Sequence, residues 1–107
     1  KPVNLLKLKD IINAQLHNTL RSNMGDPALK YDTGRFARSA EVTRIGETRT
    51  GMISIFYTYM KNPYQTFEPG YKQGSSARNP KTLISGSIRE IAQSLVSARL
   101  RIQGDSR

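Results

Sequence analysis

The chain has no cysteine, few acidic residues and no long apolar run. Without cysteine, neither disulfide bonds nor thiolate metal sites can form. No apolar run approaches the roughly 20 residues that a membrane-spanning helix needs, so we expect no membrane partner. The chain has 107 residues, only 36% of them hydrophobic, which suits one domain with a small core. We predict a single structural domain over 1–107, with flexible ends at 1–2 and 103–107.

Groups that could carry catalysis are equally scarce. His17 is the only histidine, and it falls on the polar side of a predicted helix, where a catalytic pair or a zinc site would need a companion. The eight acidic residues are scattered without paired spacing. No glycine-rich phosphate-binding fingerprint is present. We therefore predict no catalytic residue, no metal and no cofactor, and expect that the protein is not an enzyme.

Positive charge is what the chain has in excess. Lysine and arginine number 17 against 8 acidic residues, a net charge of +9. Between residues 70 and 102, six basic residues face the single acid Glu90. Such a balance favours an anionic partner, whether nucleic acid, a membrane surface or an acidic protein face, without choosing among them. One reading is therefore a basic nucleic-acid-binding module, whose affinity would fall steeply with salt.

The spacing of apolar residues predicts two helices around a hairpin. A helix over about 3–24 follows from a stripe at steps of three or four: Leu5, Leu8, Ile12, Leu16, Leu20 and Met24. A second helix over 80–102, opened by an asparagine and a proline, follows from Ile84, Ile88, Ile91, Leu95, Ala98 and Ile102. Alternating residues on either side of a glycine-flanked turn predict an antiparallel hairpin near 40–59. The predicted class is α+β, with two amphipathic helices packed on one face of a small antiparallel sheet.

A basic turn follows the first predicted helix. We expect Thr33 to cap a short helical piece that ends near Ser39. Arg35 and Arg38 flank Phe36, so Phe36 would point to the core while both guanidinium groups project from one side. Those groups suit pairing with a neighbouring subunit or with phosphate, and a solvated basic turn is the simpler alternative.

Aromatic residues gather between positions 57 and 71, at Tyr57, Tyr59, Tyr64, Phe67 and Tyr71. Alternate tyrosines on a strand can belong to the core. Tyrosine is also favoured in subunit interfaces, and interleaved aromatic and basic residues can stack on single-stranded nucleic acid. The polar segment 70–79 that follows is predicted to be a long loop with a functional role.

The order of these elements resembles the small tail-completion or neck proteins, the head-to-tail connectors, of tailed bacteriophages. The matching stretches are Thr33–Ser39, Tyr57–Tyr64 with Phe67–Gly70, and Arg78–Lys81 followed by Ile88–Ala92. The resemblance implies a structural, non-enzymatic virion protein at the head–tail junction or in the tail. It would form a homo-oligomeric ring around the DNA channel, contact neighbouring portal, adaptor or tail proteins, and be assembled in the host cytoplasm.

These considerations define two predicted surfaces. The predicted subunit interface comprises Arg35, Phe36, Arg38, Tyr59, Tyr64, Phe67, Tyr71, Lys72 and Arg78. Non-specific contact with genomic DNA is predicted for the basic side of the closing helix, at Arg89, Arg99 and Arg101.

Overall fold

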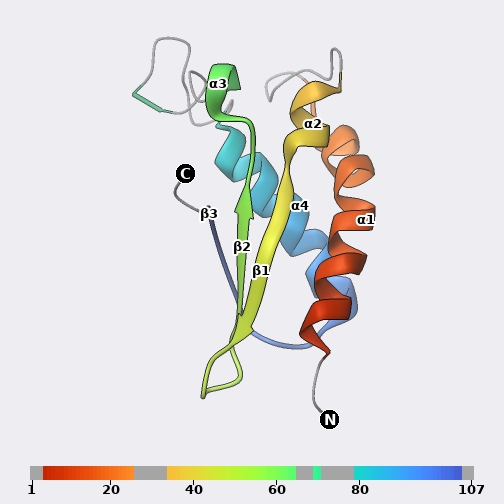
Figure 1. Ribbon diagram of the computed structural model, residues 1–107, viewed down its shortest axis with the longest axis vertical. Coiled ribbons are helices and arrows are strands. Elements are labelled where there is room, and N and C mark those ends of the chain that lie inside the picture. The colour runs from red at the N-terminus through yellow and green to blue at the C-terminus, as the bar shows by residue number, and fades with distance from the viewer. Residues whose placement is uncertain (1–3, 26–33, 65–68, 71–78, 105–107) are drawn as a thin grey trace.

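A computed structural model describes residues 4–25, 34–64, 69–70 and 79–104. Helices and a small sheet share one core, so the predicted α+β class is confirmed (Figure 1). The elements follow in the order α1 (Leu5–Asn23), α2 (Arg35–Ser39), β1 (Glu41–Glu47), β2 (Ile53–Thr58), α3 (Lys61–Tyr64), α4 (Pro80–Leu95) and β3 (Leu100–Gly104).

The three strands form one mixed sheet in the order β1-β2-β3. Strands β1 and β2 are antiparallel, with Ile45 opposite Ile55, which confirms the predicted hairpin. Its turn is closed by a 2.9 Å hydrogen bond from the Thr48 N–H to the Met52 carbonyl. Strand β3 runs parallel to β2, with Leu100 opposite Ile53. The chain reaches β3 by crossing over through α4, as a parallel pair requires.

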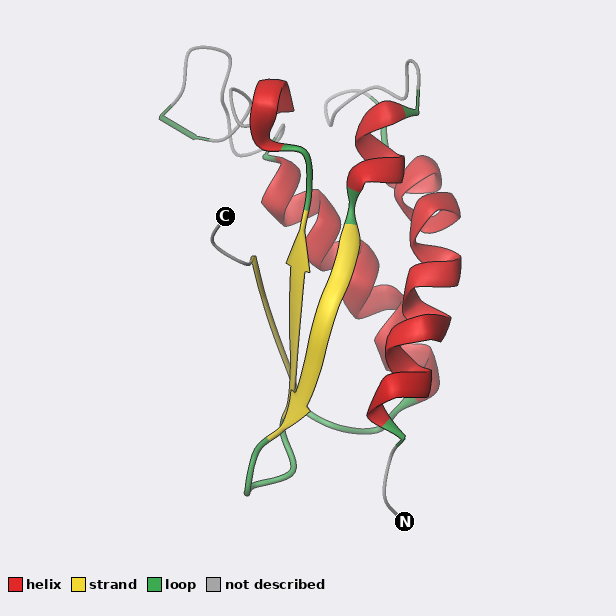
Figure 2. Ribbon diagram, in the orientation of Figure 1, coloured by secondary structure: helices red, strands yellow, loops and turns green. Residues whose placement is uncertain are grey.

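The core lies on one face of this sheet. In β2, Ile53, Ile55 and Tyr57 are at most 1% exposed, whereas the residues between them are half-buried. Helices α1 and α4 cover the buried face and pack against each other (Figure 2). The buried residues of α1 all belong to its predicted stripe: Leu8, Ile12, Leu16 and Leu20. In α4, Ile84, Ile88 and Ile91 of the predicted stripe are buried together with Pro80, Ser87 and Ala92, whereas Leu95 is exposed.

The predicted helix over 80–102 is wrong beyond Leu95. At Val96 the backbone turns extended, with φ −138° and ψ 148°, and residues 100–104 form β3. Ala98, Leu100 and Ile102 pack against the core, so apolar residues alternate with polar ones at the period of a strand. The sheet is therefore mixed and not purely antiparallel. An extended segment here supplies the third strand that a hairpin needs for stability, and a continued helix would not.

An asparagine joins α1 to the edge of the sheet. The Asn13 side-chain amide donates to the Val42 carbonyl at 3.0 Å, and its oxygen accepts from the Val42 N–H at 2.8 Å. Val42 lies on the edge strand β1 and is fully buried. The carboxamide thus pairs both main-chain groups of Val42, as a further strand would. Because an unpaired buried main-chain group is costly, this contact fixes where α1 sits along β1.

Replacing Asn13 by alanine should lower the free energy of unfolding by about 2 kcal/mol, since two hydrogen bonds worth about 1 kcal/mol each are lost. Urea denaturation measures the change. The matched control is Asn18→Ala, because Asn18 is an exposed residue of the same helix. Equal stability of the two variants would contradict the proposed role of Asn13.

Candidate functional site

Helix α2 begins at a glycine in the left-handed region. Gly34 is the N-cap, with φ 78° and ψ 0°, and no side chain caps the helix. Its carbonyl accepts from the Arg38 N–H at 2.9 Å. A residue with a Cβ would pay about 1–2 kcal/mol for this backbone, so the glycine is needed for geometry. The predicted cap Thr33 lies outside the described residues, and the N-cap position belongs to Gly34.

An aromatic cluster lies beneath α2. The Phe36 ring meets the Tyr59 ring edge to face, with centroids 5.9 Å apart, and the Tyr64 ring at 4.9 Å. Phe36 is 3% exposed and Tyr59 is 6% exposed, so the prediction that Phe36 points to the core is confirmed. These two rings belong to the core of the chain, so little of their area is exposed for the predicted subunit interface. Their packing supports α2 and α3, which carry the exposed side chains at this end of the molecule.

Ser39 ties the end of α2 to the start of α3. Its hydroxyl donates to the Phe36 carbonyl at 2.7 Å and accepts from the Met60 N–H at 3.1 Å. We call residues 34–39 and 59–64 the corner; α2 and α3 lie at the same end of the molecule (Figure 1). Its outer surface presents exposed Arg35, Arg38 and Met60 beside half-buried Tyr64. The corner thus combines cationic and apolar groups above a buried aromatic cluster.

Part of the predicted interface lies outside the described residues. This applies to Phe67, Tyr71, Lys72 and Arg78, and with them to most of the predicted loop 70–79.

The three arginines assigned to one basic face are separated by the fold. Arg89 is exposed on α4, whereas Arg99 and Arg101 follow the end of that helix. Arg101 lies on β3 between Leu100 and Ile102, which both pack against the core, so its side chain projects from the opposite face of the sheet. The single basic side predicted for the closing helix does not exist because β3 replaces the end of that helix.

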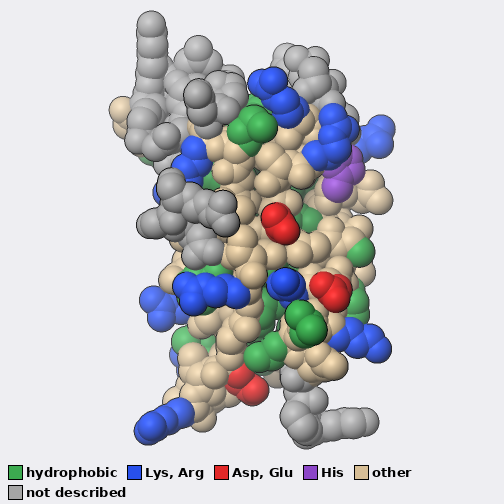
Figure 3. All heavy atoms as spheres, in the orientation of Figure 1, with side chains coloured by type: hydrophobic (Ala, Val, Ile, Leu, Met, Phe, Trp, Pro, Cys, Tyr) green, Lys and Arg blue, Asp and Glu red, His purple; other side chains and the backbone are tan. Residues whose placement is uncertain are grey.

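Arg101 shares this face with Arg44, which sequence reasoning missed. Arg44 on β1 pairs with Phe56 on β2, and its guanidinium carbon lies 4.0 Å from the centre of the Phe56 ring. We call the face of the sheet turned away from α1 and α4 the open face; its positions are Glu41, Arg44, Gly46, Ser54, Phe56, Thr58, Arg101 and Gln103. The alternation of Val42, Arg44 and Ile45 is broken by a β-bulge, which hides the outward direction of Arg44 in the sequence. On the side of the molecule that Figure 3 shows, lysine and arginine side chains are scattered over the surface and acidic ones are fewer.

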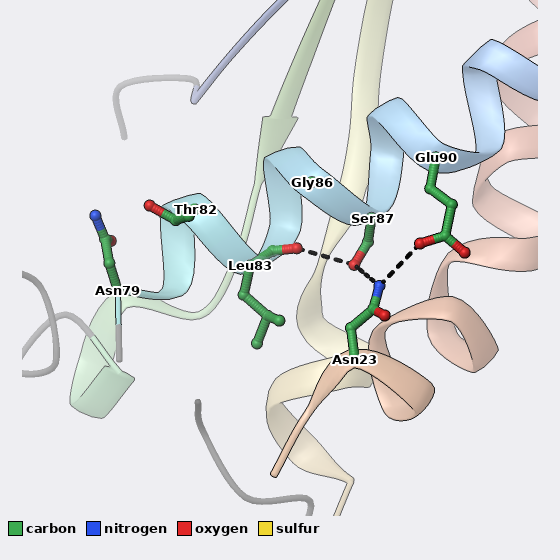
Figure 4. Close-up of a pocket in the computed structure, with 7 residues that line it drawn as sticks. All are labelled: Asn23, Asn79, Thr82, Leu83, Gly86, Ser87 and Glu90. Carbon is green, nitrogen blue, oxygen red and sulfur yellow. Dashed lines mark hydrogen bonds between the residues drawn. The ribbon is translucent and has the colours of Figure 1, made fainter. Parts of the chain in front are cut away.

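A cavity of about 340 Å³ lies where α1 ends against α4. The Asn23 amide lies 3.0 Å from the Ser87 hydroxyl and 3.3 Å from the Glu90 carboxylate (Figure 4). Ser87 is fully buried, and its hydroxyl donates to the Leu83 carbonyl at 2.9 Å. A nucleophilic serine needs an adjacent base, yet the proton of Ser87 is already committed to a main-chain oxygen. These polar groups connect α1 to α4, and their arrangement is structural.

Other chemistry has little support in the described residues. Within residues 4–25, 34–64, 69–70 and 79–104, no three His, Cys, Asp or Glu side chains gather closely enough to hold a metal ion. None of the helices described there has the length and apolar character needed to cross a membrane.

Comparison with known proteins gives a family match. The model of a family described as bacteriophage T5 tail completion protein p143 matches residues 2–106. No curated protein and no solved structure matches the chain. The matched range includes every element from α1 to β3. The resemblance to phage tail-completion proteins is confirmed.

Truncating Phe36 should show how much the buried aromatic cluster, compared with the exposed side chains of the corner, contributes to stability. We expect Phe36→Ala to lower the free energy of unfolding by about 3–5 kcal/mol, because it removes a buried ring and leaves a cavity. Arg35→Ala is the control, with a change of at most about 1 kcal/mol, since an exposed position and any exposed ion pair there contribute little to stability. Urea denaturation of both variants tests this, and a cost for Phe36→Ala near that of Arg35→Ala would show that the cluster does not hold the corner.

Proposed function

The chain belongs to the family of the bacteriophage T5 tail completion protein p143, and on that premise we propose that it is a ring-forming structural protein of the virion. The match over residues 2–106 carries this proposal. A tail-completion family implies a structural role in a phage tail and contact with other tail or head proteins. We place the ring at the head-to-tail connector or tail-completion region, around the DNA channel, with no catalytic activity.

The corner is the proposed contact between neighbouring subunits. Gly34, Phe36 and Ser39 shape the corner, and Arg35 and Arg38 are exposed on its surface. An arginine can pair with a carboxylate through two parallel hydrogen bonds, which gives direction as well as energy. We therefore assign Arg35 and Arg38 to acidic groups of the next subunit.

Apolar area at the corner would add to these ion pairs. Met60 is 39% exposed and Tyr64 is half-buried, and both residue types are enriched in protein interfaces. A contact between the corner of one subunit and a different surface of the next is heterologous, and such contacts close into a ring when the rotation permits. The completed ring would dock on portal, adaptor or tail proteins during assembly in the host cytoplasm.

Reversing both charges at the corner should prevent assembly without unfolding the subunit. In Arg35→Glu with Arg38→Glu, like charges would face the acidic groups of the neighbour, so we expect at least a tenfold weaker self-association. Native mass spectrometry over a range of protein concentrations measures the oligomer, both for the isolated protein and for complexes recovered from assembled tails. Circular dichroism verifies that the variant is folded.

The matched control is Lys7→Glu with Arg89→Glu, which reverses two exposed charges on α1 and α4. It has the same net charge as the corner variant and should assemble as the unmodified protein does. Intact assembly of the corner variant would show that the arginines are not in the subunit contact. Loss of assembly in both variants would point to net charge and not to the corner.

A further inference from the structure

The open face of the sheet carries cations and polar groups without an apolar patch. Its central ring, Phe56, is half-buried and lies under the Arg44 guanidinium. The remaining positions of β2 and β3 on this face are Ser54, Thr58, Arg101 and Gln103. No described helix packs on this side, because α1 and α4 share the other face (Figures 1 and 2).

The arginines are spread across the whole width of this face. Arg44 is on one edge strand and Arg101 is on the other, so their Cα atoms are two strand spacings, or roughly 10 Å, apart across the sheet. Arg101 pairs with Ser54, two residues before Phe56, which adds about 7 Å along the strands. Arg99 extends the row by two more residues, since Ala98 and Leu100 on either side of it pack against the core.

The composition of the open face distinguishes between two kinds of anionic partner. The centre of a protein–protein interface is usually depleted of charge and rich in apolar groups, and this face has the opposite character. Interfaces with DNA are polar and strongly basic, and Arg, Ser, Thr and Gln side chains are common phosphate ligands. Among the described residues of this face, the one carboxylate is that of Glu41, which pairs with Thr58 at the end away from Arg99.

We propose that the open face binds the phosphate backbone of double-stranded DNA through Arg44, Arg99 and Arg101. The duplex carries one negative charge per about 1.7 Å of its axis, so a patch of this width meets several phosphates at once. Phe56 holds the Arg44 guanidinium above the sheet, where it is presented to the partner. The face has no element that enters a groove, so the binding is independent of base sequence.

This inference rests on the proposed function only for the source of the DNA, which is the genome that passes through the ring. Each subunit alone contributes a few phosphate contacts and binds weakly. A ring that presents the same face several times towards one duplex binds more tightly, because later contacts form within a complex that already exists.

Binding of a fluorescent 30-base-pair duplex, followed by anisotropy between 20 and 200 mM NaCl, tests the inference. The variant Arg99→Gln with Arg101→Gln removes two of the three cations and leaves the aromatic contact of Arg44 in place. Its binding should be at least tenfold weaker at low salt. The slope of log affinity against log salt should be shallower by about 1.8, since each phosphate contact contributes about 0.9.

The matched control, Lys7→Gln with Arg89→Gln, removes two exposed cations from the helical side and should keep the slope of the unmodified protein. Equal losses in both variants, or a larger loss in the control, would overturn the assignment to the open face. Absence of duplex binding by the unmodified protein at 20 mM NaCl would overturn it as well. In that case, binding of polyglutamate that depends on Arg99 and Arg101 would identify an acidic protein as the partner.

Native mass spectra of the same samples separate this inference from the proposed function. If the protein binds the duplex through Arg99 and Arg101 but forms no ring, the assignment of the DNA-binding face stands and the proposed ring is wrong. If the protein forms the ring but both variants bind the duplex equally well, the proposed ring stands and the assignment of DNA binding to the open face is wrong.

Discussion

One-sided burial of the sheet is the constraint on which the rest of the structure depends. Residues alternate along β2, so Ile53, Ile55 and Tyr57 face the helices while Ser54, Phe56 and Thr58 face away. A strand cannot shift by one residue without exchanging these two sets. The buried set determines where the apolar stripes of α1 and α4 pack. The other set leaves a polar face that the described helices do not cover.

Two polar contacts position the helices on that core. Asn13 pairs with both main-chain groups of Val42 and places α1 along the edge strand. Asn23 reaches Ser87 and connects the end of α1 to α4. The corner depends on the same frame, because Phe36 and Tyr59 extend the core to the end of the sheet and α2 rests on them. The short helix α2, anchored by buried Phe36 and Ala37, thereby carries Arg35 and Arg38 at the surface.

Regular periodicity made much of the fold predictable. The stripes of α1 and of α4 as far as Ile91 each have a spacing that only a helix satisfies, and the alternation in β2 is unbroken. The end of α4 was mispredicted because Ala98 and Ile102 satisfy the helical spacing as well as alternation with Arg99 and Arg101. Only hydrogen bonding to β2 decides between a helix and a strand here, and β2 is distant in the sequence. Arg44 was missed for a related reason, since the bulge beside it breaks the alternation of β1. The short contacts of Ser39 and Asn13 depend on tertiary placement and have no local sequence signal.

In the proposed arrangement, buried residues shape the corner and its surface arginines contact the neighbouring subunit. Cryo-electron microscopy of virions of the phage that encodes this chain tests that arrangement most directly. We expect density for several copies in a closed ring at the head–tail junction or tail-completion region, with α2 and α3 of each copy against its neighbour. Copies that are isolated from one another, or a ring whose subunit contacts leave Arg35 and Arg38 facing solvent, would contradict it.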